Sequence, residues 1–186
     1  MSDNIQLSPF SQQDHQFMRR AMQLAELAEQ QGEVPVGAVL VKDGQIIAEG
    51  WNLSISEHDA TAHAEIQTLR KAGQVLGNYR LLDTTLYVTL EPCPMCAGAL
   101  LHSRVKRIVF GAPDLKAGAA GTVLNLFEHQ AAYHYADVES GLLEQECRAQ
   151  LQSFFKRRRK EQKSQRKQAK QVEQGSEQDD PQQPHE

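Results

Sequence analysis

The stretch TLYVTLEPCPMCAGALLH, residues 85–102, passes from strand to helix within a few residues and so decides the fold class. Residues 85–90 are rich in β-branched and aromatic side chains, which favours a strand. The helix begins at Pro94, because a proline at the first helical position sacrifices no intrahelical hydrogen bond. It runs to about His102. A strand that leads directly into a helix is typical of α/β proteins.

The other segments continue this alternation. Hydrophobic spacing and turn residues predict a helix from Ser11 to about Gln30, a hairpin of 36–41 and 45–51 about Asp43-Gly44, a helix over 63–72, short strands at 107–110 and 136–139, and a last helix from about Leu142. Residues 112–130 are loop-like. We therefore expect a three-layer α/β/α fold. Its central mixed sheet of about five strands has an antiparallel hairpin edge joined to parallel strands.

Composition restricts the class of protein. The 186 residues, 40% hydrophobic and 24% charged, suit one globular domain. No apolar run approaches the roughly 18 residues of a membrane span, so we expect no membrane partner. The N-terminal sequence lacks the pattern of a secretory signal. Three cysteines are too few for a disulfide framework, and we expect a reducing, cytoplasmic location.

Charge is distributed unevenly along the chain. Residues 1–155 carry 11 Lys and Arg against 18 Asp and Glu, a net charge of −7. Residues 156–170 carry 9 against 1, a net charge of +8, and residues 171–186 carry none against 5. Apolar residues almost vanish after about residue 160, and such a segment buries too little surface to offset its ordering entropy. We expect a folded domain over 1–160 and a disordered polar tail over 161–186.

Cys93 and Cys96 lie one turn apart at the predicted helix start, where the helix dipole lowers thiol pKa values. By themselves they fit a metal site, a thioredoxin-like redox pair or two buried cysteines. The third, Cys147, lies in the last helix, and we expect it in the core.

A second motif narrows these alternatives. In TAHAEI, residues 61–66, His63 and Glu65 can share one pocket only at a helix end, where His63 has non-helical dihedrals. Thr61 is the expected N-cap. Helix starts that follow extended segments gather at one edge of a sheet. His63 would then join Cys93 and Cys96, although an ordinary capping or core histidine remains the alternative.

One imidazole and two thiolates leave the fourth position of a tetrahedral zinc ion open, which is the mark of a catalytic site. Such an ion activates a water molecule near neutral pH. Glu65 has the chemistry of a proton shuttle for hydrolysis of an amidine-like C–N bond. The alternative is a first-turn carboxylate that stabilises the helix dipole by under about 1 kcal/mol.

The chain at this point resembles the zinc nucleobase and nucleoside deaminases, and among them the bacterial tRNA-specific adenosine deaminases. The resemblance spans about residues 11–160. The matching segments are EVPVGAVLV (33–41), GWN (50–52), TAHAEI (61–66), NYRL (78–81), TLYVTLEPC-x-MCAGA (85–99) and RIVFGA-x-D-x-K-x-GAAG (107–121). It implies a cytidine-deaminase-like fold and hydrolysis of the wobble adenosine to inosine in the anticodon stem-loop of tRNA.

The resemblance also implies a role for individual residues. His63, Cys93 and Cys96 would bind one Zn²⁺ per subunit, and Glu65 would be the catalytic proton shuttle. Asn52 and the backbone of Ala64 would hydrogen-bond the flipped base, although asparagine is also a common turn residue. Asp114 would lie near the target ribose, and the pocket walls would be Val34, Pro35, Val36 and Leu90.

Two positions depart from the family pattern, in which proline often stands at the place of Ala60 and a basic residue at that of Pro113. The first change would loosen the loop before His63, and the second removes a candidate phosphate contact. The basic tract could be a solvated helix end, but we expect it to contact RNA phosphates through Lys156, Arg157, Arg158, Arg159 and Lys160. The resemblance implies a homodimer, with 102–130 as a plausible interface.

Two other functions remain open. A free-base or nucleoside deaminase, acting on cytosine, cytidine or guanine, would use the same metal chemistry without a polyanion surface. A zinc-stabilised RNA-binding module would have a fourth protein ligand and no need of Glu65.

Overall fold

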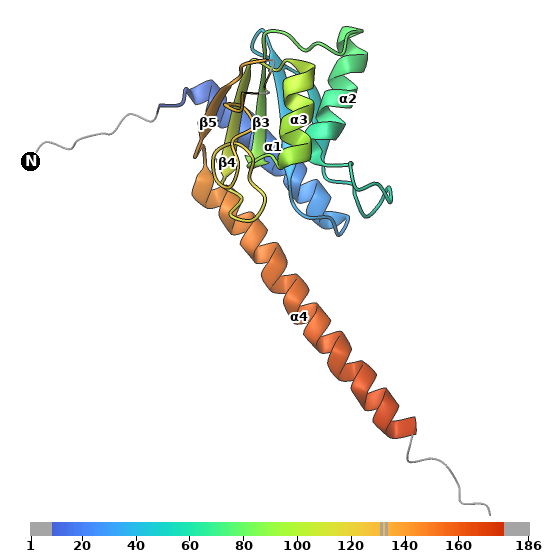
Figure 1. Ribbon diagram of the computed structural model, residues 1–186. Coiled ribbons are helices and arrows are strands. Elements are labelled where there is room, and N and C mark those ends of the chain that lie inside the picture. Colours follow the sequence, from blue (N-terminus) through green and yellow to red (C-terminus); the bar gives the residue numbers. More distant parts are fainter. Residues whose placement is uncertain (1–8, 131, 133, 177–186) are drawn as a thin grey trace, which may run out of the picture. The chain divides into compact units, whose positions relative to one another are not determined.

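The computed structural model describes residues 9–130, 132 and 134–176. Nine helices and strands follow one another in these residues (Figure 1), namely α1 (Gln12–Gln30), β1 (Gly37–Lys42), β2 (Gln45–Trp51), α2 (Ala64–Leu76), β3 (Thr84–Leu90), α3 (Pro94–Ser103), β4 (Arg107–Ala112), β5 (Asp137–Ser140) and α4 (Glu144–Ser176). The predicted elements are all present, and most boundaries agree within two residues. The second helix is longer than expected: it continues past Gly73 and ends at Gly77, which adopts a left-handed conformation.

The five strands form one sheet in the order β2-β1-β3-β4-β5. Strand β1 is antiparallel to both β2 and β3, whereas β3, β4 and β5 run parallel. The hairpin turn has φ angles of 49° at Asp43 and 74° at Gly44. Two left-handed residues match the twist of paired strands, so Asp-Gly is suited to this turn. The mixed sheet with an antiparallel hairpin edge is confirmed.

Helix α1 covers one face of the sheet. Ser11 accepts a hydrogen bond from the backbone of Asp14, and the Asp14 side chain binds back to the backbone of Ser11, which completes a capping box. Its apolar stripe packs into a cluster with the start of α4, and the buried members are Met18, Ala21, Leu24, Val39, Val41, Tyr87, Val109, Ala112, Leu142 and Cys147. The expected core position of Cys147 is confirmed.

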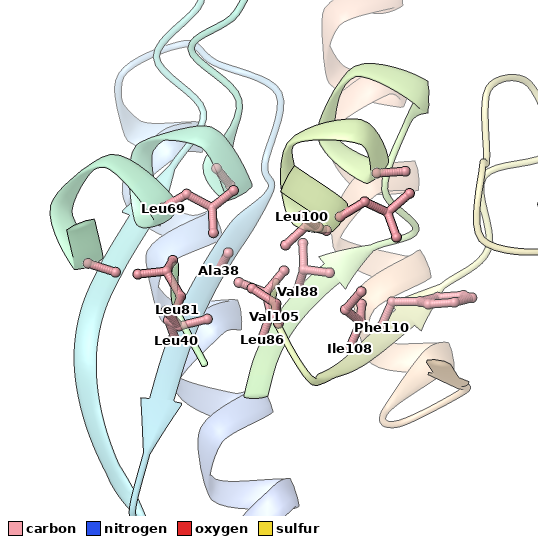
Figure 2. Close-up of a cluster of buried hydrophobic side chains, with 14 of the residues drawn as sticks. Ala38, Leu40, Leu69, Leu81, Leu86, Val88, Leu100, Val105, Ile108 and Phe110 are labelled. Atoms are coloured by element: carbon pink, nitrogen blue, oxygen red, sulfur yellow. The ribbon is translucent and has the colours of Figure 1, made fainter. Parts of the chain in front are cut away.

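Helices α2 and α3 cover the opposite face. Figure 2 shows Leu69 of α2 and Leu100 of α3 directed at the sheet side chains Leu40, Val88 and Ile108. All of these side chains except Leu69, which is 8% exposed, are fully buried. Helices on both faces of one sheet give the expected three layers, and the shared core fixes the starts of α2 and α3 at one end of that sheet.

A polar network ties α1 to the sheet. Asp14 accepts hydrogen bonds from the Tyr87 hydroxyl (2.5 Å) and from Arg107 (2.7 Å), and Arg107 also binds Glu139 through two bonds of 2.8 and 3.0 Å. Burial by itself would raise the pKa of Asp14, but hydrogen bonds from Arg107, Tyr87 and Ser11 hold that pKa well below its usual value. Asp14 is therefore charged in the folded state.

The chain divides into two compact units, one ending at Leu151 and the other beginning at Gln152. Helix α4 continues to Ser176, so residues 161–176 are helical, in contrast to the disorder expected for them. The expectation of disorder was based only on the scarcity of apolar side chains that could be buried. The segment is rich in strong helix formers, and Glu161 pairs with Arg157 (3.6 Å) and Arg158 (3.7 Å). A domain boundary at about residue 160 stays a prediction, and 177–186 lie outside the described residues.

None of the helices in the described residues combines the length and apolar character needed to cross a membrane.

Candidate metal centre and active site

The two ligand-bearing motifs stand at the starts of α2 and α3. His63 and Cys93 are the N-cap residues, with extended dihedrals of φ −76°, ψ 157° and φ −73°, ψ 171°. The non-helical conformation expected for His63 is thus confirmed, but Thr61 is not the cap. The Thr61 backbone and hydroxyl instead donate to Asp59, at 2.7 Å each, in the preceding turn. These hydrogen bonds hold the turn that contains Ala60.

The three ligand atoms form one compact group. His63 Nδ1 lies 3.7 Å from Cys93 Sγ and 3.6 Å from Cys96 Sγ, and all three atoms lie within 4.8 Å of one another. A tetrahedral zinc ion with ordinary bond lengths places a nitrogen and a sulfur ligand about 3.5 Å apart. The spacing and the donor set therefore fit zinc, and Cys96 is fully buried beneath the group.

The thiols differ in their acidity. The pKa of Cys93 is lowered to about 4, chiefly by a hydrogen bond with Cys96, and the pKa of Cys96 is raised by the same interaction. The pKa of His63 is raised, first by its hydrogen bond with Cys93. One thiolate is present at neutral pH, and a divalent cation would draw off the second proton, because ligation requires deprotonated thiols.

Glu65, the second residue of α2, is only 4% exposed. Burial raises the pKa of its carboxyl to about 7; the negative charge of Cys93 also raises this pKa, whereas His63 lowers it. A cation on the three ligands would lower it as well. A buried carboxyl with this pKa differs from an ordinary exposed first-turn carboxylate, and it can accept and release a proton near neutral pH.

A cavity of about 180 Å³ opens beside the metal ligands. It is lined by Val34, Val36, Asn52, His63, Glu65, Leu90, Glu91, Cys93 and Asp114. The structure thus brings together all the predicted base-pocket and catalytic residues except three. Pro35 and Cys96 are buried and do not line the cavity, although Cys96 belongs to the ligand group, and the Ala64 backbone donates to Asn52.

Asn52 links the two sides of this cavity. Its Oδ1 accepts a hydrogen bond from the backbone of Ala64 at 2.9 Å, and its Nδ2 donates to the carbonyl of Val34 at 3.1 Å. The two groups predicted to bind a base therefore bind each other. A base-binding role for them stays a prediction, and it requires a base to share or replace these bonds.

Gly50 of β2 sets the position of α2. A Cβ atom at Gly50 would lie 2.5 Å from Thr68 Oγ1 and 2.6 Å from the carbonyl of Ala64. The absence of a side chain lets the first turns of α2 press directly against the strand. His63 and Glu65 depend on this close approach, because they begin that helix.

Glu91 belongs to the site but was not predicted. It is 2% exposed, and its Oε1 accepts hydrogen bonds from the backbones of Ala120 and Thr122, each at 3.0 Å. Its Oε2 accepts from the backbone of Asp114 at 3.0 Å, and a Cβ on Gly118 would lie 2.3 Å from this oxygen. Glu91 therefore fixes the loop that brings Asp114 to the cavity. The sequence signal that could have identified Glu91 was a carboxylate placed between an apolar strand and a ligand cysteine.

Glu33 also holds a loop of the site in place by accepting backbone hydrogen bonds. It is 1% exposed, and its Oε1 accepts hydrogen bonds from the backbones of Ile55 (2.9 Å) and Ser56 (2.7 Å) and from the Ser56 hydroxyl (2.8 Å). This anchors the loop that leads from Asn52 to His63. The sequence signal was weak, since a lone glutamate after a helix is usually solvated.

The predicted RNA-contact residues, Lys156 to Lys160, lie on α4 within the second unit and are exposed.

Residues 11–112 match the zinc-binding region of the cytidine and deoxycytidylate deaminases. The chain is similar to the tRNA-specific adenosine deaminase of Haemophilus influenzae, at 56% identity over 152 residues that cover 81% of this chain and 88% of that protein. Among solved structures it resembles one from a study of A-to-I editing by tRNA:A34 deaminases at the wobble position, with a TM-score of 0.72 and 45% identity over 73% of this chain and 99% of the other.

A guanine deaminase structure from Bacillus subtilis is also similar, with a TM-score of 0.52 and 47% identity over 57% of this chain and 69% of the other. The family match spans the helices and strands that carry His63, Glu65, Cys93 and Cys96. By this match and by the geometry of its metal centre, the chain belongs to the cytidine and deoxycytidylate deaminase family of zinc enzymes.

Proposed function

We propose that this chain deaminates the wobble adenosine in the anticodon loop of tRNA to inosine. The observation that carries the proposal is the buried Glu65 carboxyl beside the three-ligand group of His63, Cys93 and Cys96. The similarity to the Haemophilus influenzae enzyme supports adenosine in tRNA as the substrate.

Each residue of the site has a task in this reaction. His63, Cys93 and Cys96 would hold a zinc ion, which would supply the Lewis acid needed to make a water molecule nucleophilic near neutral pH. Glu65 accepts one proton from the attacking water and delivers it to the purine ring nitrogen. It then accepts the second proton of that water from the new hydroxyl group on the ring carbon and delivers it to the departing ammonia. The reaction consumes adenosine and water and yields inosine and ammonia.

The size of the cavity explains why a loop is the substrate. A cavity of about 180 Å³ admits a single flat base and not a base pair. The target must therefore leave its stack, and unpaired loop nucleotides do so at the lowest cost. Val34, Val36 and Leu90 would contact the faces of the base, and Asn52 would recognise its edge.

Incubation of the zinc-loaded protein with total tRNA, followed by sequencing of A-to-inosine changes, tests the proposal. We expect inosine at the wobble position of at least one tRNA and no change with metal-free protein. The absence of inosine from every tRNA would disprove it.

A free-base or nucleoside deaminase is the second candidate, favoured by the similarity to a guanine deaminase. Ammonia release from guanine, guanosine, cytosine and cytidine, measured beside the tRNA assay, separates the two. A zinc-stabilised binding module is disfavoured, because the ligand group found among the described residues has three members and no fourth.

We also propose a homodimer. The expected interface region 102–130 exposes Leu115 (80%), Val123 (51%) and Leu124 (50%), which supports burial against a second copy. Light scattering that shows only monomer at micromolar concentration would contradict this. A tRNA substrate and free thiols at all three cysteines favour the cytoplasm as the place of action.

A further inference from the structure

The positive charges of the basic tract, residues 156–170, are unevenly distributed around the axis of helix α4. Residues advance by about 100° each along an α-helix, and α4 is helical throughout this region. Viewed down the axis, six of the cations between Lys156 and Lys167 fall within an arc of about 120°. We call them the basic stripe, and they are Lys156, Arg159, Lys160, Lys163, Arg166 and Lys167.

Arg157 and Arg158 point to the other side of the helix, where Glu161 also lies. Their guanidinium groups lie 3.6 and 3.7 Å from the Glu161 carboxylate, and Arg157 also stacks over the Phe154 ring at 5.6 Å. In contrast, no carboxylate in the described part of the chain lies within ion-pairing distance of the six stripe cations. Four of the six, together with Gln162 and Ala169, line one depression on the stripe face.

The sequence around the stripe limits what it can bind. From Lys156 to Lys167 the helix carries no apolar or aromatic side chain on any face. A membrane-surface helix needs an apolar face, a helix that docks in a protein groove needs apolar anchors, and single-stranded RNA is bound by aromatic stacking. The stripe lacks the residues for all three and offers only regularly spaced positive charge.

The spacing of the charges fits a polyphosphate strand. Eleven residues separate Lys156 from Lys167, which is about 17 Å of helix and one stripe charge per about 3.3 Å. One strand of B-form DNA presents a phosphate about every 3.4 Å along its axis, and the A-form stem of an RNA is a still denser array of phosphates. We propose that the basic stripe binds the phosphate backbone of a paired stem of the tRNA substrate, and that Arg157 and Arg158 do not take part. The inference rests on the proposed function for the identity of this RNA.

Two variants that remove equal charge test the proposal. K163Q/K167Q and R157Q/R158Q each remove two cations from the same tract, and glutamine keeps the helix propensity close to that of Lys and Arg. Binding to a tRNA transcript is measured by fluorescence anisotropy between 50 and 300 mM salt. We expect K163Q/K167Q to weaken binding about tenfold at 150 mM salt and to reduce the slope of log Kd against log salt by about 2. R157Q/R158Q should bind like wild type.

Control experiments show whether binding depends on the charge of the stripe and on a paired stem. K163R/K167R keeps the charge and should bind like wild type, and an unrelated RNA hairpin with a long stem should compete, whereas a single-stranded oligonucleotide of equal length should not. Equal losses in both charge-removing variants, or no loss in either, would overturn the proposal. The proposal would also be overturned if K163Q/K167Q but not R157Q/R158Q weakened binding to vesicles with 30% anionic lipid, while neither variant changed binding to tRNA. Because binding needs no catalysis, these results stay decisive even if no inosine is formed.

Discussion

Glu65 is almost completely buried and also lies on the wall of the cavity beside the metal ligands. Replacing it by glutamine keeps the size of the side chain and removes its capacity to carry protons. We expect E65Q to lower kcat for tRNA deamination by about 10²- to 10⁴-fold, with the bound zinc unchanged at one per chain by elemental analysis. H63A should instead lose the zinc. Full activity of E65Q would refute the proton-shuttle mechanism.

Glu91 gives a second prediction at the residue scale. Its two oxygens accept three backbone hydrogen bonds, and glutamine would turn one oxygen into an NH₂ group that faces a donor. We expect E91Q to destabilise the fold by about 1–3 kcal/mol and to raise KM for tRNA more than it lowers kcat, because the Asp114 loop is released.

Urea unfolding and steady-state kinetics at saturating zinc measure both effects of E91Q. E26Q, at an exposed position of α1, is the matched control and should be neutral. An unchanged KM in E91Q would show that the loop does not contribute to substrate binding.

The residues predicted from the sequence and those that were missed differ in the kind of bond they make. His63, Glu65, Cys93 and Cys96 form a short motif whose chemistry is recognisable from residue type and spacing. Glu33 and Glu91 bind backbone N–H groups of loops 22 to 31 residues away in the sequence. Any N–H can donate such a bond, so no residue type on the partner loop marks it.

At the scale of elements, the contact between α2 and β2 depends on Gly50. We expect G50A to destabilise the protein by about 1–3 kcal/mol and to weaken zinc retention, because α2 must move away from the strand and carries His63 with it. G98A is the control, since a Cβ there would meet nothing within 4 Å. In the interior of α3 it should stabilise by about 0.5–1 kcal/mol. Thermal unfolding and chelator-release kinetics test both variants.

The network that joins α1 to the sheet predicts a pH dependence. The pKa of Asp14 in the folded protein lies below its unfolded value of about 3.9. Its stabilising effect is therefore fully present above about pH 4 and is lost as the pH falls through the folded-state pKa. D14N should cost about 3 kcal/mol at pH 7, because it leaves Arg107 without one of its partners in a partly buried site.

The free-energy difference between wild type and D14N should narrow below pH 4, as measured by urea unfolding. D83N is the control, because Asp83 is 74% exposed and lies 4.0 Å from Lys106. It should change stability by under about 0.5 kcal/mol at any pH. A constant difference between wild type and D14N from pH 7 to pH 3 would contradict the charged state of Asp14.

Element boundaries were predictable where a side chain fixes them locally, as at Ser11 and at Asp43-Gly44. The N-cap of α2 was predicted wrongly, because Thr61, the residue that resembles a cap, donates to Asp59, and His63 is the N-cap instead. The choice between Thr61 and His63 as the cap depends on the preceding loop, which sequence periodicity does not describe.

At the scale of the whole molecule, residues 1–155 have a net charge of −7 and the next fifteen residues one of +8. Truncation after Phe155 leaves the unit that ends at Leu151 intact. We expect the truncated protein to keep its zinc and its kcat at saturating tRNA, whereas KM rises and the salt dependence of binding flattens. Elemental analysis and kinetics at several salt concentrations test this. An unchanged salt slope would show that the tract contributes nothing to RNA affinity.

The tail also shows where prediction from sequence failed at this scale. The scarcity of apolar residues after position 160 agrees with the exposure of residues 161–169, but it does not decide whether the chain is helical. Helix propensity and local ion pairs are short-range and sufficient for a helix. The expectation of disorder considered tertiary burial alone.

Asn52 limits how this enzyme could be re-engineered. Because its side chain joins the first backbone N–H of α2 to the carbonyl of Val34, a substitution chosen to change base preference removes one or both of these hydrogen bonds, and the bond at the helix N-terminus is worth about 1 kcal/mol. Libraries for altered specificity should keep position 52 and vary Val34, Leu90 and Asp114, whose side chains border the cavity.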